Sequence, residues 1–202
     1  TTANVTVGIS TSGTGTEGTD YGTVSDITIT AGSTTGTATF TPTDDTTYEG
    51  NETGIIAIDT VTGGSATENG TQSVTLTITE NESAPTVTLT SSASSIAENA
   101  GSSLTLTATL SVATTANVTV GISTSGTGTE GSGGDYATVS DITITAGSTT
   151  GTTSFTPTDD STFEGNETAI IDIDSVSGGS ATENGTQSVT ITINDDDSGP
   201  AF

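Results

Sequence analysis

The sequence predicts an all-β protein built from tandem antiparallel β-sandwiches. Short segments rich in β-branched residues alternate apolar side chains with Thr or Asp, and clusters of Gly, Ser, Pro or Asn separate them. No stretch shows the apolar period of an amphipathic helix. The 202-residue chain also repeats itself over most of its length. We therefore expect the same fold to occur twice.

The two copies of the repeat are nearly identical. TTANVTVGISTSGTGTEG at 1–18 recurs unchanged at 114–131. A two-residue insertion then turns GTDY into GSGGDY, and from Asp20 and Asp135 onward the copies run in constant register. An insertion at this point indicates a loop, because loops tolerate changes of length better than strands do.

The first three strands of the complete copy are predicted at 86–91, 104–110 and 117–123. Their sequences, TVTLTS, LTLTATL and NVTVGIS, place aliphatic residues largely at alternate positions. This period of two puts one face of each strand toward the core.

The remaining four strands are predicted at 139–145, 152–156, 168–174 and 187–194. Their sequences are VSDITIT, TTSFT, TAIIDID and QSVTITIN. In the third of these, adjacent isoleucines break the alternation, so the pattern does not settle which face points inward. Seven short strands in one repeat favour a sandwich with an immunoglobulin-like layout.

The two copies differ in extent. The second, residues 85–199, is complete, whereas the first, residues 1–84, has no counterpart of 85–113 and so lacks its first strands. Residues 200–202 match the start of the second copy and are interpreted as the beginning of a further repeat. We interpret the chain as a window of a longer array. The alternative is that a neighbouring chain supplies the missing strands, and the sequence leaves both open.

The composition restricts the partners that the chain can bind. It contains 25 Asp and Glu, no Lys, Arg or His, and has a net charge of −25. Such a chain is expected to repel nucleic acid and anionic membrane surfaces, because binding to phosphate depends on cationic side chains. No apolar run approaches the ~18 residues of a membrane span, so no direct membrane insertion is expected. Cations are the natural partners.

One loop gathers the negative charge. FTPTDDSTFEGNET at 155–168 places Asp159, Asp160, Glu164 and Glu167 within nine residues. Two like charges about 4 Å apart cost roughly 4 kcal/mol at the effective dielectric of a protein surface. The loop is therefore either open to water, as solvated turn residues, or built for a cation. Because oxygen-only clusters suit hard cations, we favour calcium.

Four motifs carry a resemblance to a known family. GGDY at 133–136, PTDDSTFEGNET at 157–168, AENAG at 97–101 and INDDD at 193–197 together resemble a Calx-beta domain. The family forms the calcium-binding modules of sodium–calcium exchangers and recurs in tandem in bacterial surface proteins and adhesins. The resemblance covers the whole second copy and nearly all of the part of the first copy that is present. It implies a seven-stranded immunoglobulin-like sandwich with Ca²⁺ bound in loops at one end.

The resemblance also implies a set of calcium ligands. In the second copy they are Glu98, Asp135, Asp159, Asp160, Glu164, Glu167, Asp195, Asp196 and Asp197. In the first copy they are Asp20, Asp44, Asp45, Glu49, Glu52, Glu80 and Glu82. The first copy has no counterpart of Glu98, and its last positions depart from the three aspartates of the second. These differences put full occupancy of the first site in doubt.

The expected function is structural. Near-identical tandem copies favour a calcium-rigidified repeat of an adhesin, stalk or fibre, located outside the cell or at its surface and in contact with neighbouring repeats. The alternative is a self-assembling filament subunit, in which an identical subunit completes the first copy by strand addition. An enzyme such as a glycosidase is not expected, because no His, Lys, Cys or Arg is present to support the acidic side chains.

Overall fold

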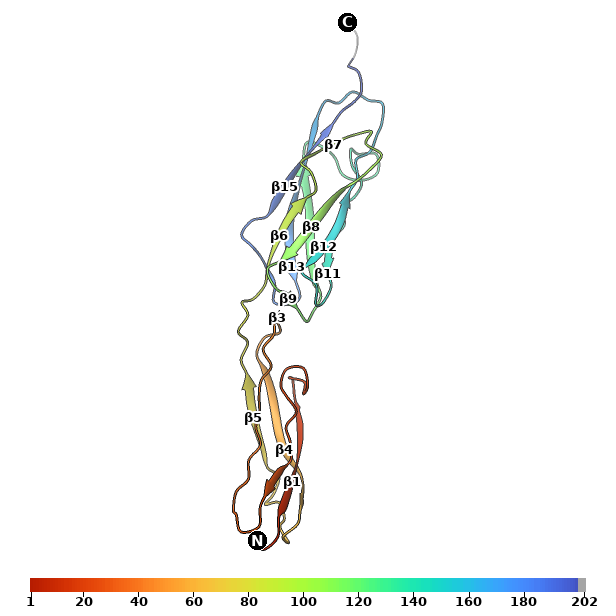
Figure 1. The fold of residues 1–202 in the computed structure, drawn as a ribbon. Helices are drawn as coiled ribbons and strands as arrows, with labels where there is room; N and C mark the ends of the chain where they lie inside the picture. Colours follow the sequence, from red (N-terminus) through yellow and green to blue (C-terminus); the bar gives the residue numbers. More distant parts are fainter. Residues whose placement is uncertain (200–202) are drawn as a thin grey trace. The chain divides into compact units, whose positions relative to one another are not determined.

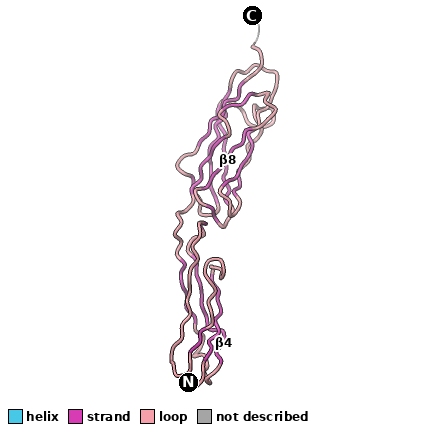
Figure 2. Tube along the Cα trace, in the orientation of Figure 1, coloured by secondary structure: helices cyan, strands magenta, loops and turns pink. Residues whose placement is uncertain are grey.

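A computed structural model of the chain describes residues 1–199, and in this range it contains strands and loops and no helix (Figure 2). The predicted start of a further repeat, 200–202, lies outside the described residues. The chain divides into two compact units. The first unit contains Thr1–Asp45 and Glu49–Asn81, and the second contains Thr46–Tyr48 and the described part of Glu82–Phe202. The described residues contain no helix long and apolar enough to cross a membrane.

The second unit is a two-layered sandwich (Figure 1). One sheet has the order β11-β10-β13-β15-β7 and the other β12-β8-β6-β14. In the first sheet the strands are β7 (Ser95–Ala97), β10 (Val118–Gly126), β11 (Ile142–Ile144), β13 (Glu167–Ser177) and β15 (Ser188–Asn194). In the second sheet they are β6 (Thr86–Ser91), β8 (Leu104–Leu110), β12 (Thr150–Phe155) and β14 (Thr182–Glu183). Each of the seven predicted strands of this copy overlaps a strand of these sheets.

Aliphatic side chains from the two sheets form one buried core. Val87 and Leu106 of the smaller sheet join Ile142, Ile171 and Ile191 of the larger sheet, and each of the five is 0% exposed. Thr occupies most of the alternating outward positions. Because successive side chains of a strand point to opposite faces, the alternation seen in the sequence produces this separation directly.

The sandwich also contains short elements that the sequence pattern did not reveal. β7 pairs in parallel with β15, and β14 pairs in parallel with β6. A further pair joins β3 (Thr47–Tyr48) to β9 (Ala113–Thr114). Elements of two or three residues are too short to show a periodic pattern, so no sequence signal distinguishes them from loop.

The first unit contains one four-stranded sheet, in the order β2-β1-β4-β5. Its strands are β1 (Val5–Gly13), β2 (Ile27–Ile29), β4 (Glu52–Thr62) and β5 (Ser73–Ile78). The pairing repeats that of β10, β11, β13 and β15 in the second unit. A bulge also recurs, between Gly8 and Ile9 in the first unit and between Gly121 and Ile122 in the second.

Candidate metal centres

Three groups of three carboxylates lie in the loops at the ends of the strands. In each group the side chains offer oxygen atoms that lie within 4.8 Å of one another. The three groups, called triads below, are Asp20–Glu49–Glu52, Asp135–Glu164–Glu167 and Glu98–Asp160–Asp197. Because the described chain has no cationic side chain, each triad holds its like charges without an internal counter-ion.

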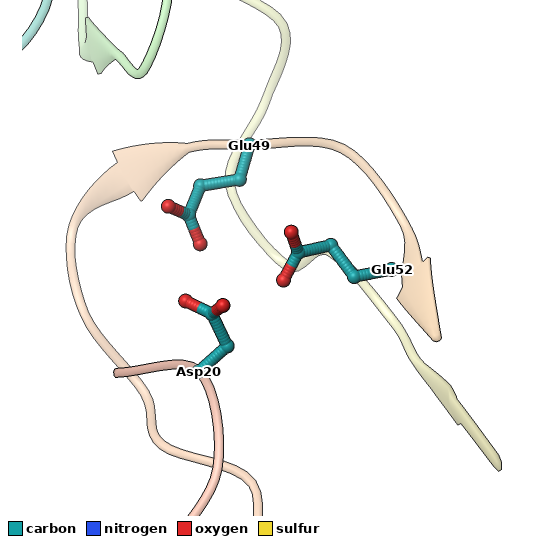
Figure 3. Close-up of side chains that lie close together, drawn as sticks. All are labelled: Asp20, Glu49 and Glu52. Atoms are coloured by element: carbon teal, nitrogen blue, oxygen red, sulfur yellow. The ribbon is translucent and has the colours of Figure 1, made fainter. Parts of the chain in front are cut away.

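The first triad belongs to the first unit (Figure 3). Asp20 lies in the loop after β1, Glu49 follows β3, and Glu52 begins β4, and the three side chains point toward one another. Asp20 is buried, with an exposed fraction of 8%. Its Oδ2 accepts a hydrogen bond of 2.5 Å from the backbone N–H of Thr16. This bond fixes the carboxylate at the base of its loop.

The second triad is the counterpart of the first in the second unit. Asp135 Oδ2 accepts hydrogen bonds from the backbone N–H of Thr129 at 2.6 Å and from its Oγ1 at 2.9 Å. Glu167 begins β13, as Glu52 begins β4. The same three positions therefore come together in both copies, as the repeated sequence leads one to expect.

The third triad occurs in the second unit. Glu98, in the turn after β7, is buried with 8% exposure, and its Oε1 accepts a hydrogen bond of 3.1 Å from the backbone N–H of Asp160. Asp197 lies just beyond β15. Its Oδ2 is buried and has no hydrogen-bond partner among the described residues. An ionised oxygen in this position lacks the donor or cation that normally compensates burial.

The loop that carries Glu164 and Glu167 has a specific backbone anchor. Asp195 Oδ2 accepts hydrogen bonds from the N–H groups of Glu164 at 3.0 Å and Gly165 at 2.5 Å. Gly165 has φ 78, a left-handed conformation that glycine adopts without steric cost. In the first unit Glu80 Oε2 accepts the corresponding bonds from Glu49 and Gly50. Asp195 and Glu80 thus position the loop.

Burial and mutual repulsion raise several pKa values in the triads. Burial, followed by the charge of neighbouring carboxylates, raises the pKa values of Glu49, Glu52, Glu164 and Asp197. Burial is also the main cause for Glu98, although the hydrogen bond from Asp160 acts against it. In each case the ionised form is disfavoured, which a bound cation would reverse.

The pKa values of Glu167 and Asp135 shift in opposite directions. Burial, then a hydrogen bond and the charge of Asp135, raise the pKa of Glu167 to about 7. Burial also acts to raise the pKa of Asp135, but hydrogen bonds from Thr129 and Glu167 outweigh it and hold that pKa below its usual value. Below about pH 7 and without a cation, protonated Glu167 therefore donates a hydrogen bond to the ionised carboxylate of Asp135.

The structure brings nine of the sixteen predicted ligands into the triads. The other seven lie outside them: Asp44, Asp45, Glu80, Glu82, Asp159, Asp195 and Asp196. Of these, Asp195 and Glu80 anchor backbone amides, Asp44 accepts a bond from Asn81, and Asp196 accepts one from Asn99. Asp159 and Asp45 are exposed and Glu82 is half-buried.

Some acidic residues outside the triads have structural roles. Asp141 Oδ1 accepts a 3.0 Å hydrogen bond from the N–H of Ile122, at the bulge of β10, and Asp26 does the same for Ile9. Glu130 accepts bonds from Thr124 and from the N–H of Val139. Their repetition at matched positions of both copies was visible in the sequence, but their partners were not.

The donor set of the triads fits calcium. Two oxygens bound to one ion at about 2.4 Å lie at most ~4.8 Å apart, and Ca²⁺ accepts several carboxylates in flexible geometry. The unpartnered oxygen of Asp197 and the raised pKa values both indicate sites that a cation would complete. The side chains provide no nitrogen or sulfur, which borderline transition metals favour.

The fold and the carboxylate triads define a class of tandem all-β modules with candidate cation sites at the strand ends. The Calx-beta domain model matches residues 1–82 and 80–197. The chain therefore belongs to the Calx-beta family, as two tandem domains. Calx-beta domains are binding modules, and no catalytic family matches.

The chain also matches solved structures. The apo form of the Calx CBD1 domain is 19% identical, with a TM-score of 0.45, and the match covers 55% of this chain and 99% of that one. CBD12 from CALX1.2 is 16% identical, with a TM-score of 0.41, over 95% of this chain and 88% of that one. A comparison with curated protein sequences finds no match.

Proposed function

We propose that the chain is a calcium-rigidified structural repeat of an extracellular or cell-surface protein, such as an adhesin, stalk or fibre. The observation that carries this proposal is the third triad, in which a buried oxygen of Asp197 lacks any partner among the described residues. A carboxylate held in this way beside Glu98 and Asp160 is suited to a cation from outside the chain.

The environment outside a cell supplies such a cation. Extracellular calcium modules bind with dissociation constants of ~0.1–1 mM. An ion that binds only the folded state adds RT ln(1 + [L]/Kd), or ~2.7 kcal/mol at a hundredfold excess over Kd. That is a large part of the ~5–15 kcal/mol of a typical domain.

Calcium in the third triad would also restrain the end of the second domain. Asp197 follows β15 and is among the last described residues of that domain. A bound ion would tie it to Glu98 in the turn after β7 and to Asp160 in the long loop. Stiffening at this point suits a repeat whose role is to extend a structure or to bear load. An array of near-identical copies gains length by repetition.

The test is thermal unfolding of the chain in EGTA, in millimolar calcium and in millimolar magnesium. We expect calcium to raise the melting temperature by several degrees, and magnesium to raise it much less because Mg²⁺ demands tighter geometry. Small-angle scattering under the same conditions is expected to show a narrower distribution of conformations with calcium. An identical melting temperature in all three buffers would refute calcium binding and leave the triads as solvated loops.

A further inference from the structure

Two asparagines of the chain are followed by glycine. Asn69 and Asn184 occupy matched positions of the two copies, each within the sequence TENGTQS. None of the other seven asparagines in the sequence precedes a glycine. The next residue matters because its backbone nitrogen can attack the asparagine side chain, and a glycine, which has no Cβ, leaves that nitrogen most accessible. The two Asn–Gly pairs are therefore candidates for a chemical modification of the chain.

The side chains of the same two asparagines also differ from the others. Asn69 and Asn184 are exposed, and neither side-chain amide makes a hydrogen bond within the part of the chain that the structure describes. Each of the other seven side chains makes at least one hydrogen bond. Asn117 Oδ1, for example, accepts a bond of 2.9 Å from the backbone N–H of Ala146. Only the two asparagines that precede glycine are thus free to rotate toward the following backbone nitrogen.

The two glycines leave room for this approach. Gly70 has φ 70 and Gly185 has φ 69, a left-handed conformation that favours glycine. At both, no atom beyond the neighbouring residues lies within 4 Å of the position that a Cβ would occupy. Among the described residues, neither glycine N–H donates a hydrogen bond. The attacking nitrogen is therefore open at both sites.

Hydrogen bonds hold the main chain of each turn without involving the asparagine side chain. Gln72 Nε2 donates to the carbonyl oxygen of Asn69 at 2.8 Å, and Gln187 Nε2 donates to that of Asn184 at 2.6 Å. The N–H of Asn184 donates to the carbonyl oxygen of Val87 at 2.9 Å. The folded turn therefore keeps its shape while its side-chain amide stays exposed to water.

We propose that Asn69–Gly70 and Asn184–Gly185 are sites of spontaneous deamidation in the folded protein. The glycine nitrogen loses its proton to hydroxide and attacks Cγ of the asparagine. A bond between this nitrogen and Cγ forms, the bond from Cγ to Nδ2 breaks, and Nδ2 leaves with the electron pair and a proton from water as ammonia. Water then adds to either carbonyl of the resulting succinimide and opens the ring to aspartate or isoaspartate. The reaction consumes only water and needs no oxidant, reductant or enzyme.

The product changes both the charge and the backbone of the turn. Each event adds one negative charge to a chain whose net charge is already −25. Isoaspartate at position 184 also routes the main chain through Cβ, between the N–H that meets Val87 and the carbonyl that meets Gln187. Both bonds are not expected to survive this change of spacing, so β14 should separate more readily from β6.

The test is incubation of the folded full chain at pH 8, followed by digestion at acid pH, where deamidation is slow, and mass spectrometry. We expect Asn69 and Asn184 to convert about tenfold or more faster than any other asparagine. Gly185→Ala adds a Cβ beside the attacking nitrogen and disfavours the left-handed φ, so conversion at Asn184 should fall about tenfold or more. Asn69 in the same chain is the matched control and should convert unchanged, and Gly70→Ala should give the reverse result.

A peptide of residues 181–187 separates the effect of the turn from that of the sequence. Conversion in the peptide but not in the folded chain would show that the turn protects the asparagine and would overturn the proposal. Conversion of hydrogen-bonded asparagines such as Asn117 at the same rate would overturn it too. If circular dichroism shows that Gly185→Ala unfolds the second unit, Asn184→Gln replaces it, because this exposed change keeps an amide but disfavours ring closure. Loss of the product at position 184 with unchanged conversion of Asn69 would support the proposal.

Discussion

Glu98 Oε1 accepts a 3.1 Å hydrogen bond from the backbone N–H of Asp160, across a separation of 62 residues. The bond joins the turn after β7 to the long acidic loop that precedes β13. Asp197, from the end of β15, completes the group. Three segments that are distant in the sequence therefore meet at one point, where an ion would tie them together.

Replacing Glu98 tests the third triad. Glu98→Gln keeps the side-chain length and an oxygen that can accept from Asp160, but removes one charge from the ligand set. We expect calcium affinity at this site to fall about tenfold or more, since charge count tunes such sites. Calcium titration by calorimetry should lose one class of site.

The control for this prediction is Asp174→Asn, which removes an exposed charge outside the triads. It should leave the titration nearly unchanged. An equal loss of calcium affinity in both variants would mean that calcium binding depends on net charge alone. The third triad would then not be a specific site.

We expect the charge of Glu167 to destabilise the second domain without calcium and to stabilise it with calcium. Burial and the nearby Asp135 raise its pKa, so at pH 8 its charge destabilises the calcium-free domain. Glu167→Gln should therefore raise the calcium-free melting temperature at pH 8 and reduce the further rise on adding calcium. Thermal unfolding in EGTA and in calcium measures both effects.

Glu52→Gln is the matched variant in the first unit, where burial and Asp20 raise the pKa of Glu52. We therefore expect Glu52→Gln to raise the calcium-free melting temperature at pH 8 and to reduce the further rise on adding calcium. A variant that lowers the melting temperature in both buffers would contradict the repulsion argument and indicate that these glutamates are needed for packing.

The raised pKa of Glu167 also predicts how the stability of the calcium-free domain depends on pH. A glutamate whose pKa rises from 4.5 to about 7 on folding stabilises the folded state when it is protonated. That contribution is complete below about pH 4.5 and is lost as pH rises through 7. In EGTA, the domain should therefore become less stable between pH 5 and pH 8.

Calcium should reverse this trend, because it binds the ionised carboxylate and competes with the proton. Melting curves of the second unit at several pH values, with and without calcium, measure the effect. Calcium-free stability that instead rises from pH 5 to pH 8 would contradict the shifted pKa, and Glu167→Gln should flatten the slope.

Much of the fold could be predicted from the sequence because its strands are periodic. Alternation of aliphatic residues with Thr located all seven strands of the second copy, and the repeat extends the pattern to the parts of the first copy that the sequence contains. It could not show that 35–40 remains outside a strand while 150–155 forms one. Their sequences are almost the same, and the difference depends on pairing with β8, which is a tertiary effect.

The candidate site was only partly predictable. The density of acidic residues identified the loops, but not which oxygens converge. Asp195 and Asp197 are both predicted ligands. Asp197 joins a triad, whereas Asp195 Oδ2 accepts hydrogen bonds from the amides of Glu164 and Gly165. Both residues lie beyond the end of β15, where side-chain directions no longer follow the regular alternation of a strand, and composition alone does not assign those directions.

The last prediction compares equivalent core residues in the two units. Ile171 is 0% exposed and Ile56 is half-buried, although they occupy matched positions of β13 and β4. Ile171→Ala should cost the second unit about 2–5 kcal/mol, as expected for a fully buried aliphatic side chain. Ile56→Ala should cost the first unit only about 1 kcal/mol, because less apolar area is removed from water on folding. Denaturant-dependent hydrogen exchange, followed separately in β4 and β13, measures the two effects. Equal losses would show that the first sheet is already covered in solution.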